Sequence, residues 1–110
     1  MVAESVKTSL VLREMVRRLV EAMQPERIYL FGSQARGDAS DESDYDLLVI
    51  VREATQPRHK LARMAFRTLC GVGVSKDVVV LTLDEFERKK TVPASLPATV
   101  LREGNLLYAA

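Results

Sequence analysis

The chain has 110 residues, of which 47% are hydrophobic and 28% are charged, and its formal net charge is +1. This length fits one domain, residues 1–110, and this composition is that of a globular protein and excludes a disordered one. The near-neutral charge argues against a long nucleic-acid partner, which usually requires a clear basic excess, and the single cysteine excludes an internal disulfide.

The first predicted elements are a helix and a short strand. Apolar residues recur with helical spacing from Val6 to Met23, charged residues occupy most of the other face, and Pro25 ends the pattern. Residues 28–31 are β-branched, aromatic or leucine, which is typical of a buried strand, and Gly32 closes it.

Two further strands are expected over residues 46–51 and 77–81, and both are apolar enough to be internal. Between them, Pro57 suits the first turn of a helix whose apolar stripe runs to Val72. Cys70, at the end of this stripe, is expected to be a small core residue.

The last third of the chain is predicted to be more irregular. Thr82 and Glu85 have the capping-box spacing, so a short helix should follow them as far as Lys90. Residues 91–97 contain two prolines and suggest a loose connection, 98–103 one or two helical turns, and 106–108 an edge strand. Strands alternating with helices predict an α/β fold, a small mixed β-sheet with helices mainly on one face.

Three aspartates mark the starts of the two internal strands. Asp44 and Asp46 are two residues apart and should therefore point to the same side. Adjacent carboxylates repel unless a cation neutralises them, and Mg²⁺ accepts one or two carboxylates together with phosphate oxygens and water. With Asp77 on a neighbouring strand, the three could hold two Mg²⁺ ions about 3.5–4 Å apart, with Asp77 as the candidate base.

The residues around the first strand end predict a phosphate-binding turn. Gly32 lets a phosphate approach the backbone, Ser33 adds a hydroxyl donor, and Arg36 is expected to reach a phosphate or to brace the acidic loop. With Ser43 they form the predicted nucleotide-binding set. Each feature alone also has an ordinary structural explanation as a turn, a helix cap or a surface ion pair. Their joint occurrence at fixed spacing favours a nucleotide site.

These residues carry a family resemblance. Gly32-Ser33 followed by Asp44-x-Asp46 resembles the signature of the DNA polymerase β-like nucleotidyltransferase superfamily, and the fuller pattern, with Asp77 and a closing segment at 101–108, resembles its minimal nucleotidyltransferase branch. The resemblance implies a palm-like fold, Mg²⁺ as cofactor and ATP as substrate. It further implies an antitoxin that transfers AMP to a tyrosine of a HEPN-domain toxin.

Two alternatives stay open from the sequence. The same chemistry could modify a small molecule such as an aminoglycoside, with a separate helical chain completing the site, or the chain could be a non-catalytic antitoxin that masks its toxin. No signal peptide or membrane-spanning run is visible, so the expectation is a cytoplasmic protein without membrane contact. A homo-oligomer is compatible with the sequence. The basic residues Arg58, Arg63 and Arg67 and the segment 91–97 are the expected partner surface.

Overall fold

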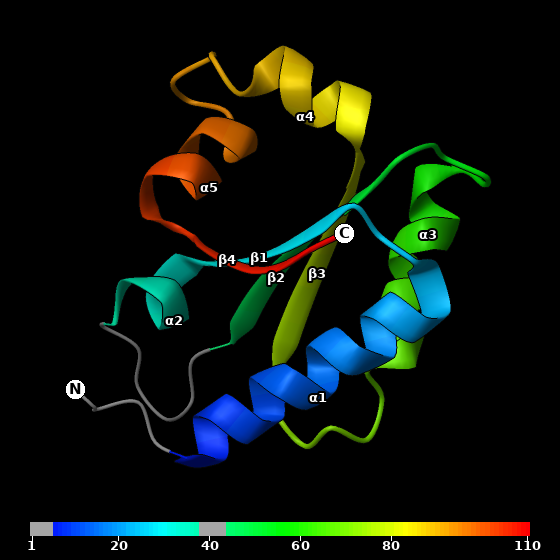
Figure 1. Cartoon of the computed structure of the whole chain (residues 1–110), viewed down its shortest axis with the longest axis vertical. Helices are drawn as coiled ribbons and strands as arrows, with labels where there is room; N and C mark the ends of the chain where they lie inside the picture. The colour runs from blue at the N-terminus through cyan, green and yellow to red at the C-terminus, as the bar shows by residue number, and fades with distance from the viewer. Residues whose placement is uncertain (1–5, 38–43) are drawn as a thin grey trace.

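The computed structural model describes residues 6–37 and 44–110 (Figure 1). Along the chain, the described residues form α1 (Val6–Met23), β1 (Arg27–Phe31), α2 (Gly32–Arg36), β2 (Tyr45–Val51), α3 (Arg58–Thr68), β3 (Lys76–Thr82), α4 (Leu83–Lys89), α5 (Leu96–Glu103) and β4 (Asn105–Ala109). Among these helices, none combines the length and the apolar character needed to cross a bilayer.

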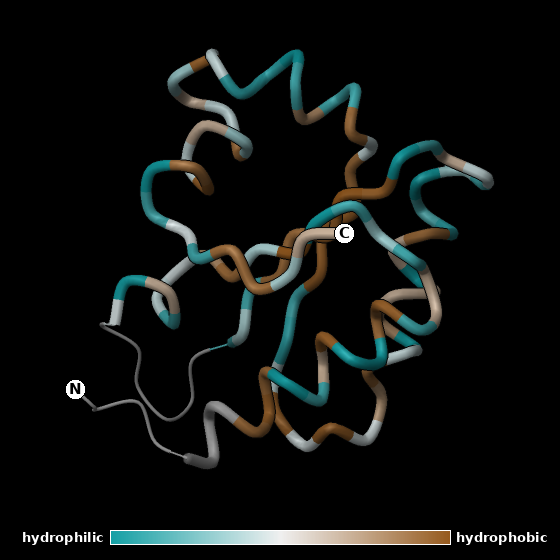
Figure 2. Tube along the Cα trace, viewed as in Figure 1, coloured by the Kyte–Doolittle hydropathy of each residue, from teal (hydrophilic) through white to brown (hydrophobic). Residues whose placement is uncertain are grey.

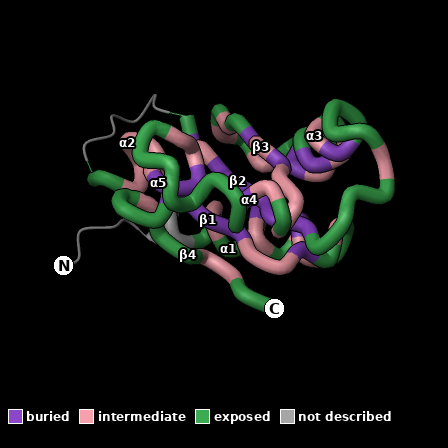
Figure 3. The backbone as a smooth tube through the Cα atoms, turned by 90° about the horizontal axis from the view of Figure 1, so that it is seen from above, coloured by how far each residue is buried: buried purple, intermediate pink, exposed green. Residues whose placement is uncertain are grey.

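The four strands form one mixed sheet in the order β3-β2-β1-β4. β2 lies antiparallel to β1 and parallel to β3, and β4 pairs antiparallel with the free side of β1. The predicted strands are confirmed, including the edge position of the last one. β1 and β2 are central and almost entirely buried, whereas exposed residues dominate β4 (Figure 3).

Helices of unequal length cover the two faces of the sheet. The long helices α1 and α3 lie on one face, and the short α4 and α5 lie on the other (Figure 1). Strand alternation supplies both cores: Leu47 and Val49 of β2 point to the long helices, while Leu48 and Ile50 pack with Phe86 of α4. The fold is therefore the expected small α/β fold, with a thinner second helical layer over the face opposite the main one.

The boundaries of the short helices follow from their caps. Thr82 accepts a hydrogen bond from the backbone N–H of Glu85, and the Glu85 carboxylate accepts one from the N–H of Thr82, which confirms the predicted capping box. Ser95 caps α5 with its hydroxyl oxygen, which accepts a hydrogen bond from the backbone N–H of Ala98, at 3.2 Å. The helix therefore begins at Leu96, so the loose connection expected over residues 91–97 is shorter than predicted.

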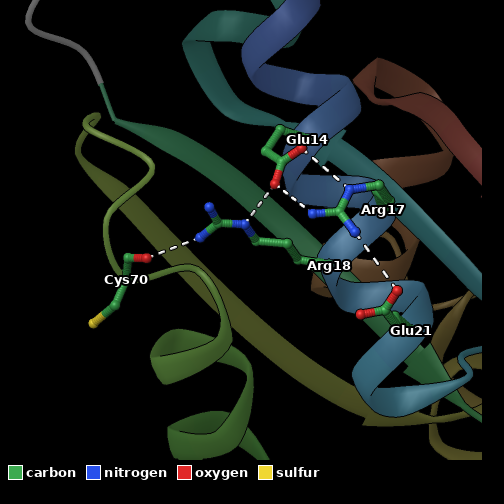
Figure 4. A network of polar contacts seen from close by, with 5 residues as sticks. All are labelled: Glu14, Arg17, Arg18, Glu21 and Cys70. Carbon is green, nitrogen blue, oxygen red and sulfur yellow. Dashed lines mark hydrogen bonds and ion pairs between the residues drawn. The ribbon is translucent and has the colours of Figure 1, made fainter.

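A polar network on α1 ties this helix to the turn after α3 (Figure 4). Glu14 accepts hydrogen bonds from Arg17 and Arg18, each with a shortest distance of 2.7 Å, and these lower the pKa of its carboxyl to about 2. Arg18 also donates to the carbonyl oxygen of Cys70, at 2.8 Å. The prediction that Cys70 is a core residue is wrong, because the side chain is exposed and this turn uses its backbone.

Candidate active site

Asp46 and Asp77 are neighbours in the centre of the candidate site. Each is the second residue of its strand, and in the parallel β2–β3 pair the two residues lie opposite each other. In-register residues on adjacent strands point to the same face, at a strand spacing of about 4.8 Å. That face is the one covered by α4 and α5, because Asp46 shares it with Leu48 and Ile50.

Asp44 stands directly before β2 and is exposed. Burial raises the pKa of Asp46, and the negative charges of Asp77 and Asp44 raise it further, while Arg36 opposes the shift. The negative charges of Asp44 and Asp77 therefore both act on the carboxyl group of Asp46. Within residues 6–37 and 44–110, however, no three acidic, histidine or cysteine side chains form a ready-made metal cage.

Gly32 lies directly against Asp46, a contact that the sequence did not predict. Phe31 is opposite Asp46 in the antiparallel β1–β2 pair, so the turn after β1 passes over the Asp46 side chain. A Cβ on Gly32 would lie 2.2 Å from Oδ2 of Asp46, and the residue has a φ of +75°. Glycine is thus required by both the backbone conformation and the carboxylate beneath it. The approach of a phosphate to Gly32 stays a prediction, and the contact with Asp46 is a second constraint on the same residue.

Ser33 lies in the first turn of α2, a five-residue helix that starts directly after β1. The residue before this helix, Phe31, provides no side-chain cap, and Gly37 ends the helix by donating its N–H to the carbonyl oxygen of Ser33, at 3.0 Å. Ser33 is half-buried. The predicted site residue Ser43 lies outside the described residues.

Arg36 connects α2 to the end of α5. Its Nη1 is 3.7 Å from Oε1 of Glu103, and both side chains are partly exposed. Gly104, the next residue, approaches the sheet closely, since a Cβ there would lie 2.8 Å from the carbonyl oxygen of Leu30 and 2.7 Å from that of Val100. Glu103 thus pairs with the arginine whose charge acts on Asp46, and Gly104 allows this end of α5 to lie close to β1. The sequence analysis gave neither residue a role in the site, although both stand in the closing segment that carries the family resemblance.

The basic strip on α3 is not part of this constellation. Arg58 pairs with Glu85 near the opposite end of β3, and Arg63 and Arg67 are exposed. α3 covers the face of the sheet opposite to the two aspartates. Arg63 and Arg67 are thus separated from Asp46 by the thickness of the sheet, and Arg58 by the length of β3.

Comparison with known proteins places this geometry in a family. The model of the nucleotidyltransferase domain family matches residues 12–104. A proposed protein adenylyltransferase of Methanocaldococcus jannaschii is 32% identical over 83 residues, which cover 76% of this chain and 78% of the relative. A second one from the same organism is 43% identical over 44 residues, 38% of this chain, and the match spans only 44% of that relative.

Solved structures share the fold at lower identity. A proposed nucleotidyltransferase of Sulfolobus solfataricus aligns with a TM-score of 0.59 and 22% identity, over 99% of this chain and 93% of that one. A toxin–antitoxin structure with AMP-PNP aligns with a TM-score of 0.57 and 21% identity, over 90% of this chain and 73% of that one. The toxin–antitoxin pair MntA-HepT aligns with a TM-score of 0.53 and 20% identity, over 93% and 73%.

Proposed function

This chain belongs to the nucleotidyltransferase domain family, and on that basis we propose that it transfers AMP from ATP to a hydroxyl of a partner protein. The observation that carries the proposal is the in-register pair Asp46 and Asp77 beneath the Gly32 turn. Even partial burial of one carboxylate beside another is costly in a protein without a cationic ligand, and Asp46 is half-buried beside Asp77. Such a pair, with a raised pKa at Asp46, supports the proposal that this is the functional site.

The names of similar proteins support the choice of substrate and acceptor. Two relatives are named as protein adenylyltransferases, which favours a protein hydroxyl over a small molecule. A structural neighbour carries AMP-PNP, an ATP analogue, and belongs to a toxin–antitoxin complex. The acceptor proposed here is accordingly a tyrosine hydroxyl of a toxin partner of the HEPN type, with this chain as antitoxin.

The chemistry of the donor set fits Mg²⁺. Asp46 and Asp77 offer hard carboxylate oxygens, Asp44 lies close enough to affect the charge state of Asp46, and the first turn of α2 leaves the Ser33 hydroxyl for a phosphate. These three carboxylates would hold the ion, or two ions, together with the triphosphate. When bound, Mg²⁺ neutralises charge on the phosphates and lowers the pKa of the attacking hydroxyl.

In the proposed reaction, these residues have different roles in one displacement at the α-phosphorus of ATP. The tyrosine oxygen forms a bond to the α-phosphorus of ATP, the bond from that phosphorus to the bridging oxygen breaks, and pyrophosphate leaves. Asp77 accepts the hydroxyl proton, directly or through water. Ser33 and the N–H groups of the first turn of α2 orient the departing phosphates, and Arg36 offsets the charge beside Asp46.

Mass spectrometry of the partner tests the proposal. The chain is incubated with ATP, Mg²⁺ and a candidate HEPN-type toxin partner, and a parallel reaction contains aminoglycosides. The proposal predicts one or more AMP units on a toxin tyrosine, lost with Asp46→Asn and kept with the exposed control Asp84→Asn. A tight complex without any mass change would show a masking antitoxin. Modified aminoglycoside with an unmodified toxin would show a small-molecule enzyme.

A further inference from the structure

An open apolar groove runs between α1 and the edge strand β4, on the face of the sheet opposite to Asp46 and Asp77. It has a volume of about 840 Å³. Its floor consists of apolar side chains from both elements: Leu12, Val16, Val20, Leu107 and Tyr108. These residues pack on the main core from one side and are only partly buried. A groove of this size and character, away from the candidate active site, is typical of a protein–protein contact.

The groove arises from an irregularity in β4. Ile28 pairs with Tyr108 and Tyr29 pairs with Leu106, so Leu107 is an extra residue in the ladder. A bulge of this kind places two consecutive side chains on one face, here Leu107 and Tyr108 beside α1. Leu106 points to the other side and is 53% exposed. β4 also has no neighbour on its outer side among the described strands, which leaves one row of backbone groups available.

The polar rim of the groove indicates which partner fits. Leu12, Val16 and Val20 form one row along α1 at intervals of four residues. Arg13, Arg17 and Glu21 form the adjacent row and line the groove.

Charge is distributed unevenly along this rim. Arg17 is neutralised within the helix by its hydrogen-bonded pair with Glu14, at 2.7 Å, whereas its ion pair with Glu21 is longer, at 3.6 Å (Figure 4). Arg13 has no ion-pair partner among the described residues, and Glu21 is 78% exposed. The rim is therefore positive at its N-terminal end and negative at its C-terminal end, about 12 Å apart on the helix axis.

We propose that this groove is the contact surface between two copies of this chain. A row that is positive at one end and negative at the other is complementary to itself when two such helices run antiparallel. A two-fold axis at the level of residue 17, the midpoint of 13 and 21, brings Arg13 beside the second copy's Glu21 and repeats this contact, while Val16 lies next to the axis. Hydrophobic and hydrophilic residues alternate along α1, as expected for a helix with one apolar face (Figure 2).

The dimer leaves the proposed transfer site accessible. Asp46 and Asp77 lie on the α4–α5 face and on strands away from β4. The dimer is therefore independent of the proposed function, and each can fail without the other.

Charge reversal at the two ends of the rim tests the proposal. The dissociation constant of the full chain is measured by sedimentation equilibrium from micromolar to millimolar concentration. Arg13→Glu and Glu21→Arg should each weaken the dimer by about tenfold or more, because two symmetric contacts become repulsive. The two single variants, when mixed, should form a heterodimer as tight as the wild-type dimer, and the double variant should recover it. Arg63→Glu, an exposed charge reversal on α3, should change nothing.

Three results would overturn the proposal. The first is a wild-type chain that is monomeric at every concentration. The second is a dimer to which the rim variants make no more difference than Arg63→Glu, since the interface would then lie elsewhere. The third is a monomer whose complex with the toxin is weakened by Arg13→Glu, which would assign the groove to a different chain. All these variants are at exposed positions, and circular dichroism should show an unchanged fold.

Discussion

The variant Gly32→Ala tests whether Gly32 positions the Asp46 carboxylate, and a matched control distinguishes this effect from a loss of stability. The new Cβ would lie 2.2 Å from Oδ2 of Asp46, whereas an unstrained contact needs about 3.5 Å. The carboxylate must therefore rotate away by about 1 Å or more, and a misplacement of that size can reduce a rate by about 100-fold. The φ of +75° adds a separate cost to folding of about 1–2 kcal/mol.

Gly71→Ala is the matched control for this prediction. Gly71 has a φ of +87°, and a Cβ there would meet no atom within 4 Å. Both variants should lose about 1–2 kcal/mol of unfolding free energy in urea, because both place alanine in the left-handed region. Only Gly32→Ala should lose about 100-fold in kcat/KM for AMP transfer. Equal activity losses in the two variants would show that Gly32 does not act through Asp46.

Three further substitutions have distinct expected outcomes. Asp46→Asn should abolish transfer yet raise stability at neutral pH, because burial and neighbouring carboxylates raise the pKa of Asp46 in the folded state. In urea titrations, this gain should grow as the pH rises from the ordinary aspartate pKa to the raised one, stay constant above it and vanish in acid, while the control Asp84→Asn should show neither effect. Ser33→Ala should slow turnover by about 10–100-fold with little change in melting temperature, and an unchanged rate would remove Ser33 from the phosphate site. Gly104→Ala places a Cβ 2.8 Å from the backbone oxygen of Leu30, so calorimetry should show a loss of about 1–3 kcal/mol, and an unchanged Tm would contradict the close approach.

The order of elements could be predicted because each leaves a local pattern in the sequence. The apolar strands, the amphipathic α1 and the capping box of Thr82 depend on residues close together in the chain. Sheet order and register do not have such a local origin. No local pattern in the two strands predicts that β2 and β3 run parallel with Asp46 opposite Asp77. That pairing depends on α3, which connects the two strands along the chain and packs on one face of the sheet.

The candidate site was predictable as a set of residues but not as a geometry. The spacing of the residues and their places at strand starts indicated Asp44, Asp46 and Asp77, and in the structure the charges of Asp77 and Asp44 raise the pKa of Asp46. The contact between Gly32 and Asp46 joins two strands, so no local pattern could reveal it. Glu103 is a similar case, because its ion pair with the site arginine depends on how α5 packs.

The central claim is that the in-register pair on β2 and β3 is the catalytic centre of AMP transfer. The most direct measurement uses ATP labelled at the α-phosphate, Mg²⁺ and the toxin partner, and counts label on the protein against pyrophosphate released. With the wild-type chain, the two amounts should be equal, and Asp46→Asn or Asp77→Asn should give neither product although both variants still bind the partner. Transfer at the wild-type rate by either variant, at saturating Mg²⁺, would contradict it.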